Sequence, residues 1–198
     1  MQAQRHLIVL AIAALLGGCA TAPANLSTAP VAAYRDSIQL TGRIFVNYQK
    51  DGQQQNLNGK FDWSQQPGRV DVSLSSQLDT TMAKISVTPQ QATLTQAGQQ
   101  ALMAADIDKL TQRALGWSLP VSGLREWMQG YATDASGKQF TASPAHNTVT
   151  TKDGWRLRFV SWQDENAAHP VPKRIDAERG AALSGDEMSI KILIDPAA

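Results

Sequence analysis

The sequence is short of the side chains that bind metals or form covalent cross-links. Its 198 residues include one cysteine and three histidines. A single cysteine cannot form an internal disulfide. His146 and His169, the two histidines outside the N-terminal stretch, lie in polar or proline-bounded sequence, and no spacing of His or Cys predicts a metal site. We therefore expect a core without disulfides, and neither a metal ion nor another cofactor.

The motifs of common catalytic sites are also absent. The sequence has no G-x-S-x-G turn and no glycine-rich phosphate loop. Asp164 and Glu165 are adjacent carboxylates, but they fall in a polar stretch and are interpreted as solvated surface. The chain is therefore expected not to be an enzyme.

An excess of charge of one sign is missing as well. Lysine and arginine total 18 against 17 aspartates and glutamates, so the formal net charge is +1. Nothing in this balance predicts a basic field that would attract nucleic acid. Long hydrophobic runs are absent too, because the apolar stretch Leu7 to Leu16 has only about ten residues, too few to span a bilayer.

That apolar stretch fits a secretory signal followed by a lipid anchor. Arg5 precedes it, and Gly17, Gly18 and Cys19 follow it. Small residues before a cleavage point let a signal peptidase seat the extended chain. The arrangement resembles a bacterial lipobox, whose cysteine is lipidated. We predict that residues 1–18 are a cleaved lipoprotein signal peptide and that Cys19 carries the lipid; the alternative is an ordinary signal with a coincidental cysteine.

The rest of the chain divides into a tether and one domain. Residues 19–33 begin at the lipidated cysteine and continue with small, uncharged residues and prolines, which predicts a flexible tether. Residues 34–198 show no internal repeat and have the length of a single domain.

Alternation of apolar and polar residues dominates this domain and predicts antiparallel strands with one buried face. Glycine-containing turns at residues 50–52, 66–68 and 152–154 fit hairpins. We expect roughly nine to eleven strands at hairpin spacing. They are placed at residues 40–49, 57–64, 69–75 and 83–87, around 94 and 102, and at 147–151, 155–162, 172–178 and 187–195.

Two short helices interrupt the strands. The first is predicted at about residues 106–116, with Asp106 as its N-cap. The second is predicted at about 122–130, with Ser122 as its N-cap and with Leu124, Trp127 and Met128 on one face. Two short helices cannot cover so many strands laid flat, so the sheet must curl around them. The expected fold is mainly β (α+β), a curved antiparallel sheet that forms a half-open barrel with a short-helix lid. From periodicity alone, a solid core is preferred over a ligand cavity.

The central segment, LGWSLPVSGLREW at residues 115–127, resembles the helical motif of the LolB family of outer-membrane lipoprotein receptors. Flanking segments agree: Gly42 to Ile44, Gly59 to Trp63 and Pro172 to Ile175. The resemblance covers nearly the whole chain from about Tyr34.

This resemblance implies a half-open barrel around an apolar cavity, in place of the solid core. It implies a monomer at the periplasmic face of the outer membrane that accepts lipoproteins from the carrier LolA and inserts them, without a cofactor. The partners would be LolA, the acyl chains of lipoprotein cargo and outer-membrane lipid. The candidate acyl-binding residues are Ile44, Phe61, Trp63, Leu74, Leu124, Trp127, Met128 and Phe159.

Leu78 lies alone in the polar stretch SSQLDTT at residues 75–81. On the sequence alone, a single exposed leucine needs no explanation. The resemblance implies instead a protruding loop whose exposed leucine delivers cargo to the membrane. The alternative for the whole chain is a lipid-binding or structural envelope lipoprotein without a transfer role, which would need no exposed hydrophobic residue at this point.

Overall fold

A computed structural model describes residues 26–50, 52–117, 119–180 and 187–196. The predicted signal peptide and Cys19 lie outside the described residues. Among the helices of the described part, none is both long and apolar enough to cross a membrane.

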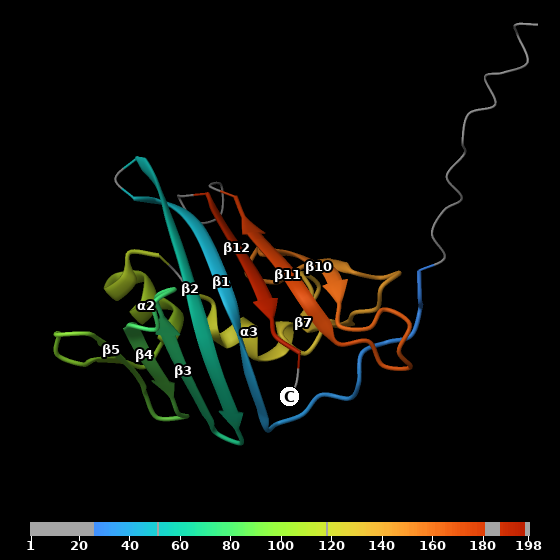
Figure 1. The fold of residues 1–198 in the computed structure, drawn as a ribbon, viewed down its shortest axis with the longest axis horizontal. Helices are drawn as coiled ribbons and strands as arrows, with labels where there is room; N and C mark the ends of the chain where they lie inside the picture. The colour runs from blue at the N-terminus through green and yellow to red at the C-terminus, as the bar shows by residue number, and fades with distance from the viewer. Residues whose placement is uncertain (1–25, 51, 118, 181–186, 197–198) are drawn as a thin grey trace, which may run out of the picture.

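Ten antiparallel strands form one curved sheet (Figure 1). In spatial order they are β6 (Leu102–Ala104), β5 (Ala92–Gln96), β4 (Thr81–Val87), β3 (Arg69–Ser75), β2 (Gln53–Gln66), β1 (Ile38–Lys50), β12 (Met188–Ile194), β11 (Pro172–Arg179), β10 (Arg156–Trp162) and β9 (Thr148–Thr150). The end strands β6 and β9 are not paired with each other, so the barrel stays open between them. The predicted half-open barrel is confirmed.

Neighbouring strands and side chains come very close to β1 at Gly42. Gly42 lies opposite Phe61 on β2 and Ile194 on β12. A Cβ atom at Gly42 would lie 2.1 Å from the carbonyl oxygen of Leu193 and 2.8 Å from the Phe61 ring. Because no side chain fits there, glycine lets the Phe61 ring lie directly over β1.

Two helices lie on the apolar side of the sheet (Figure 1). In α2 (Ile107–Leu115), the Asp106 carboxylate accepts a hydrogen bond from the Lys109 amide, and Gly116 ends the helix at φ 81°, as predicted. The second helix, α3 (Val121–Trp127), begins two residues earlier than the predicted N-cap implies. Its N-cap is Pro120, without a side-chain cap, so the assignment of Ser122 as N-cap is wrong.

A short hairpin escaped the sequence prediction. It consists of β7 (Tyr131–Thr133) and β8 (Gln139–Thr141), which pair only with each other. In β7 the adjacent residues Tyr131 and Ala132 are both buried, so this strand shows no alternation of apolar and polar residues. The described residues thus form twelve strands, and the estimate of nine to eleven suits the main sheet alone.

The last part of the expected tether is docked against the domain. The amide of Val31 donates to the Ala142 carbonyl (3.1 Å), and the amide of Ala145 donates to the Ser27 carbonyl (2.9 Å). The Tyr131 hydroxyl donates to the Ala32 carbonyl (2.7 Å), and the Val31 side chain is buried. Part of the segment expected to be a flexible tether, residues 27–32, is therefore held against the domain by hydrogen bonds and one buried apolar side chain.

Candidate functional site

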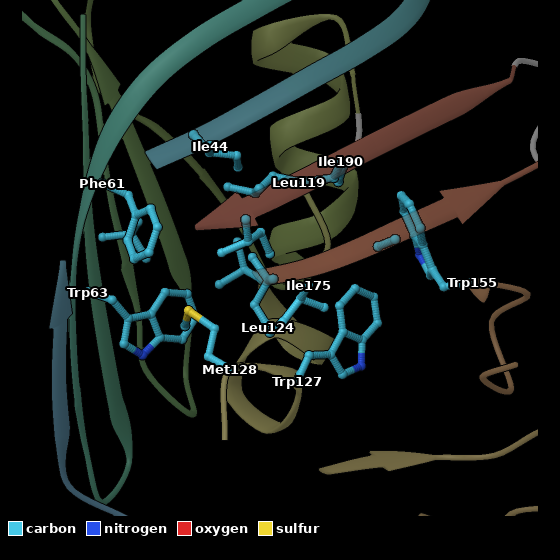
Figure 2. Close-up of a cluster of buried hydrophobic side chains, with 14 of the residues drawn as sticks. Ile44, Phe61, Trp63, Leu119, Leu124, Trp127, Met128, Trp155, Ile175 and Ile190 are labelled. Atoms are coloured by element: carbon cyan, nitrogen blue, oxygen red, sulfur yellow. The ribbon is translucent and has the colours of Figure 1, made fainter. Parts of the chain in front are cut away.

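The apolar face of the sheet and the helices above it enclose the residues singled out from the sequence. All eight candidates are between 0% and 5% exposed. Strands β1, β2, β3 and β10 supply Ile44, Phe61, Trp63, Leu74 and Phe159, while Leu124 and Trp127 belong to α3 and Met128 follows it. Figure 2 shows Met128 next to Trp63, and Leu124 near the centre of the side-chain cluster. Alternation along the strands therefore identified the buried face correctly.

A small apolar cavity lies at the centre of this cluster. Its volume is about 20 Å³, and its lining contains only hydrophobic side chains. They are Ile44, Phe61, Trp63, Val72, Leu74, Leu119, Leu124, Met128 and Ile192. A space of this size is at the lower limit for one water molecule. In this arrangement the lid is closed over an interior that is almost filled by its own side chains.

Two of the candidates lie outside the lining of this cavity. The Trp127 ring points toward Trp155 (Figure 2), with ring centroids 5.8 Å apart in an edge-on contact. The Phe159 ring is stacked between Phe140 and Trp162, at centroid distances of 6.1 and 6.2 Å. Both rings pack against neighbouring aromatic side chains rather than face the space between lid and sheet.

Leu119 is the residue that sequence reasoning missed. It lies in the loop between α2 and α3, is 1% exposed, and inserts among the side chains of the sheet near Ile44 and Ile190 (Figure 2). The signal available was an apolar Leu-Pro-Val run at the start of the second helix. Val72 and Ile192 were on predicted apolar faces but were not singled out.

Buried polar groups hold the Leu119 loop in place. The Thr111 side chain is fully buried, and its hydroxyl oxygen accepts a hydrogen bond from the Leu119 amide (3.1 Å). The same hydroxyl lies 2.9 Å from the Asp108 carbonyl oxygen, to which it donates. These contacts satisfy an amide that would otherwise be buried without a partner.

Asp108 links the first turn of α2 to the start of α3. Its carboxylate accepts hydrogen bonds from the amide (3.3 Å) and the hydroxyl of Ser122. Burial raises the pKa of the Asp108 carboxyl above its ordinary value of 3.8, although the hydrogen bonds from Ser122 act in the opposite direction. The two lid helices are therefore joined by a polar contact, whereas the lid meets the sheet through apolar side chains.

Leu78 lies outside this core, in the loop between β3 and β4. Its side chain is 89% exposed, the highest value among the large exposed hydrophobic residues of the described part. The polar neighbours Gln77, Asp79 and Thr80 are exposed as well. The loop thus presents one apolar side chain to the surroundings on a polar support.

A larger hollow of about 740 Å³ lies over the other face of the sheet, across β1 to β5. Asp62, Asp71 and Lys84 lie in its walls, with serine and threonine side chains between them. The Arg69 guanidinium binds Asp71 and lowers the pKa of that carboxyl. Charged walls of this kind do not suit an acyl chain, so the candidate lipid site is the closed apolar interior.

Within the described residues, no group of acidic, His or Cys side chains could hold a metal ion.

Comparison with known proteins assigns this architecture to a family. Residues 36–196 match the family model described as outer membrane lipoprotein LolB. The chain belongs to the LolB family. The match spans the curved sheet, both helices and the Leu78 loop, and it confirms the resemblance found in the central helical segment.

Individual LolB proteins are similar over almost their full length. Outer-membrane lipoprotein LolB of Cupriavidus necator is 36% identical over 200 residues, which cover 99% of this chain and 98% of the relative. The LolB proteins of Cupriavidus taiwanensis and Ralstonia nicotianae are 36% and 34% identical, covering 96% and 95% of this chain and 95% and 94% of the relatives. Among solved structures, a LolA superfamily protein from Nitrosomonas europaea is similar with a TM-score of 0.43 and 6% identity, over 83% of this chain and 89% of that one.

Proposed function

We propose that this protein is an outer-membrane lipoprotein, anchored through Cys19 after removal of residues 1–18, that receives lipoproteins from the periplasmic carrier LolA and inserts them into the outer membrane. Membership of the LolB family supports the outer-membrane location and the transfer role. The observation that carries the proposal is the all-apolar interior between the sheet and two short helices.

The interior is suited to acyl chains because each buried methylene group is worth about 0.8 kcal/mol. A lipoprotein's chains therefore cannot cross water unshielded. The cavity of about 20 Å³ is too small to hold them, so cargo enters only if the lid moves. Leu119, Leu124 and Met128 line the cavity from the lid side, and when the lid lifts they would exchange their contacts with the sheet for contacts with acyl chains.

The lid is built for such an exchange. The side chains that it lays on the sheet around the cavity are apolar, and non-directional contacts of this kind can be replaced by those of a ligand without leaving a buried polar group unpaired. The polar contacts of Asp108 and Thr111 lie within the lid itself. The lid can thus move as a unit while its internal hydrogen bonds remain intact.

Delivery to the membrane is assigned to Leu78. Burying one leucine side chain contributes about 1.5–3 kcal/mol. This is too little to anchor a protein, but it is enough to bring a loop of an already anchored domain into the headgroup region. A lipid-binding protein without a transfer role is the alternative, and the 89% exposure of Leu78 favours transfer over that alternative.

The test is a two-step transfer assay with purified components. A lipoprotein loaded on the periplasmic carrier is incubated with this protein, and the complex is then mixed with liposomes. We expect the lipoprotein to move first to this protein and then to the liposomes. Acceptance without delivery would support the alternative, and failure of both steps would contradict the proposal. The intact mass of the membrane-extracted protein checks the loss of residues 1–18 and the acylation of Cys19.

A further inference from the structure

The loop that carries Leu78 is a hydrogen-bonded turn with a defined shape. The Ser76 hydroxyl oxygen accepts hydrogen bonds from the amides of Leu78 (3.3 Å) and Thr80 (3.2 Å). The Ser76 amide donates to the Thr80 carbonyl (2.8 Å), and the Asp79 amide donates to the Ser76 carbonyl (3.1 Å). Four hydrogen bonds thus close a loop of five residues around one serine.

Asp79 fixes the tip of this loop to the sheet. Its backbone has φ +60°, and it is the one residue other than glycine with a positive φ in the described part of the chain. Aspartate and asparagine tolerate this left-handed conformation better than other side chains. Its carboxylate accepts a hydrogen bond from the Lys60 ammonium of β2 (2.7 Å). The ion pair therefore ties the residue next to Leu78 to a strand.

This ion pair does little for the stability of the fold. The side chains of Lys60 and Asp79 are 41% and 74% exposed, and ion pairs at such exposure contribute little to stability. What the pair and the turn determine is the direction of Leu78. An exposed leucine on a freely moving loop would be drawn toward any nearby apolar surface. Here the backbone on both sides of it is fixed, and the side chain stays 89% exposed.

We propose that Lys60, Ser76 and Asp79 are positioning residues that hold Leu78 outward, ready to enter a lipid bilayer. This inference rests on the proposed function, in which Leu78 delivers lipoproteins to the membrane. The loop is preorganised, so no conformational search precedes contact with the bilayer. Without the bracing, only the fraction of molecules with Leu78 directed outward delivers cargo.

The test measures acceptance and delivery separately in the two-step transfer assay. The variants are Lys60→Gln, Ser76→Ala and Asp79→Asn, the last of which keeps a residue suited to a positive φ. We expect normal acceptance from the carrier, an unchanged urea midpoint, and delivery to liposomes reduced about fivefold if the loop points outward in about a fifth of the molecules. Lys60→Arg keeps the ion pair and should restore delivery. The matched control is Lys84→Gln, which changes an exposed lysine on β4, the strand that follows the loop, and should behave as wild type.

A second arm separates positioning from a general structural role. In a Leu78→Ala background, Lys60→Gln and Asp79→Asn should cause no further loss of delivery, because they act only through Leu78. Additive losses, reduced acceptance or a lowered urea midpoint would overturn the inference. Normal delivery by the bracing variants, while Leu78→Glu fails to deliver, would also overturn it and leave the proposed function intact. Wild-type delivery by Leu78→Glu would instead refute the role of the loop in the proposed function.

Discussion

Two leucines in connecting loops have opposite environments. Leu78, between β3 and β4, is 89% exposed, whereas Leu119, between α2 and α3, is 1% exposed. Neither belongs to a helix or a strand. The same type of side chain is thus exposed to the surroundings in one loop and packed into the apolar interior in the other.

The backbone amides of the two leucines are bonded to different hydroxyl groups. The amide of Leu119 is bonded to the buried Thr111 hydroxyl, and its side chain lies against the sheet. The amide of Leu78 is bonded to the Ser76 hydroxyl in a turn at the surface. Hydrophobicity is the same for both residues, so the difference in exposure must come from their surroundings in the fold.

The largest effect is expected from Leu119→Ala. Removing a buried leucine side chain enlarges the cavity and should lower the free energy of unfolding by about 2–5 kcal/mol. Urea unfolding followed by tryptophan fluorescence would measure it. Leu78→Ala is the matched control and should stay within about 0.5 kcal/mol of wild type. Equal losses in the two variants would show that the buried and exposed leucines are not energetically different.

Thr111→Val should have the next largest effect. Valine has nearly the shape of threonine, but it leaves the Leu119 amide buried without an acceptor, which costs about 1–3 kcal/mol. The same urea titration measures this loss. Hydrogen exchange should show faster exchange at the Leu119 amide. If stability and exchange were both unchanged, the Thr111 hydroxyl would not be what holds the loop.

Much of this fold was predictable because one physical signal dominates it. Alternation over long strands such as β1 and β2 specifies which face is buried, and turn glycines specify the hairpins. The β7–β8 hairpin was missed because the adjacent residues Tyr131 and Ala132 are both buried, so β7 shows no alternation. The docking of residues 27–32 was missed because it depends on partners that are distant in sequence: the Ala142 carbonyl, which accepts from the Val31 amide, and the Tyr131 hydroxyl, which donates to the Ala32 carbonyl.

The candidate site was predictable only in part for a related reason. Periodicity shows which side chains are buried, but not which of them face the space between lid and sheet. Trp127 and Phe159 lie on apolar faces and yet pack against Trp155, Phe140 and Trp162. Leu119 reaches the cavity from a loop, where no period applies. Burial follows from sequence pattern, whereas cavity lining depends on tertiary packing.

The free energy of unfolding should depend on pH through Asp108, which joins the two lid helices. Because burial raises the pKa of Asp108, the folded protein binds this proton more tightly than the unfolded chain does. The stabilisation from this tighter proton binding is complete below the ordinary pKa of 3.8. It is lost as the pH rises through the higher pKa of Asp108 in the folded protein. Relative to Asp108→Asn, which cannot titrate there, wild type should become less stable as the pH rises from 3.8. Urea titrations of both proteins between acidic and neutral pH would check the trend. The reverse trend would mean that the hydrogen bonds from Ser122 outweigh burial.

The smallest effect on stability, and the sharpest on function, is expected from Leu78→Glu. The side chain is exposed, so the free energy of unfolding should change by less than about 0.5 kcal/mol. Acceptance of lipoprotein should also be normal, because the loop lies outside the cavity lining. Delivery to liposomes should fail, since a carboxylate resists transfer from water into the apolar part of a bilayer. Leu78→Ile and Leu78→Phe should deliver at nearly the wild-type rate.

Replacing each leucine with phenylalanine sharpens the comparison between them. If the exposed leucine acts only by entering lipid, any apolar side chain of similar size can replace it, whereas Leu119 must also fit the packed interior. Leu119→Phe should therefore disturb the core, while Leu78→Phe is tolerated. Delivery by Leu78→Glu at the wild-type rate would contradict membrane entry. Failure of Leu78→Phe would point instead to a shaped protein contact at the loop, because a bilayer does not discriminate between apolar side chains by their shape.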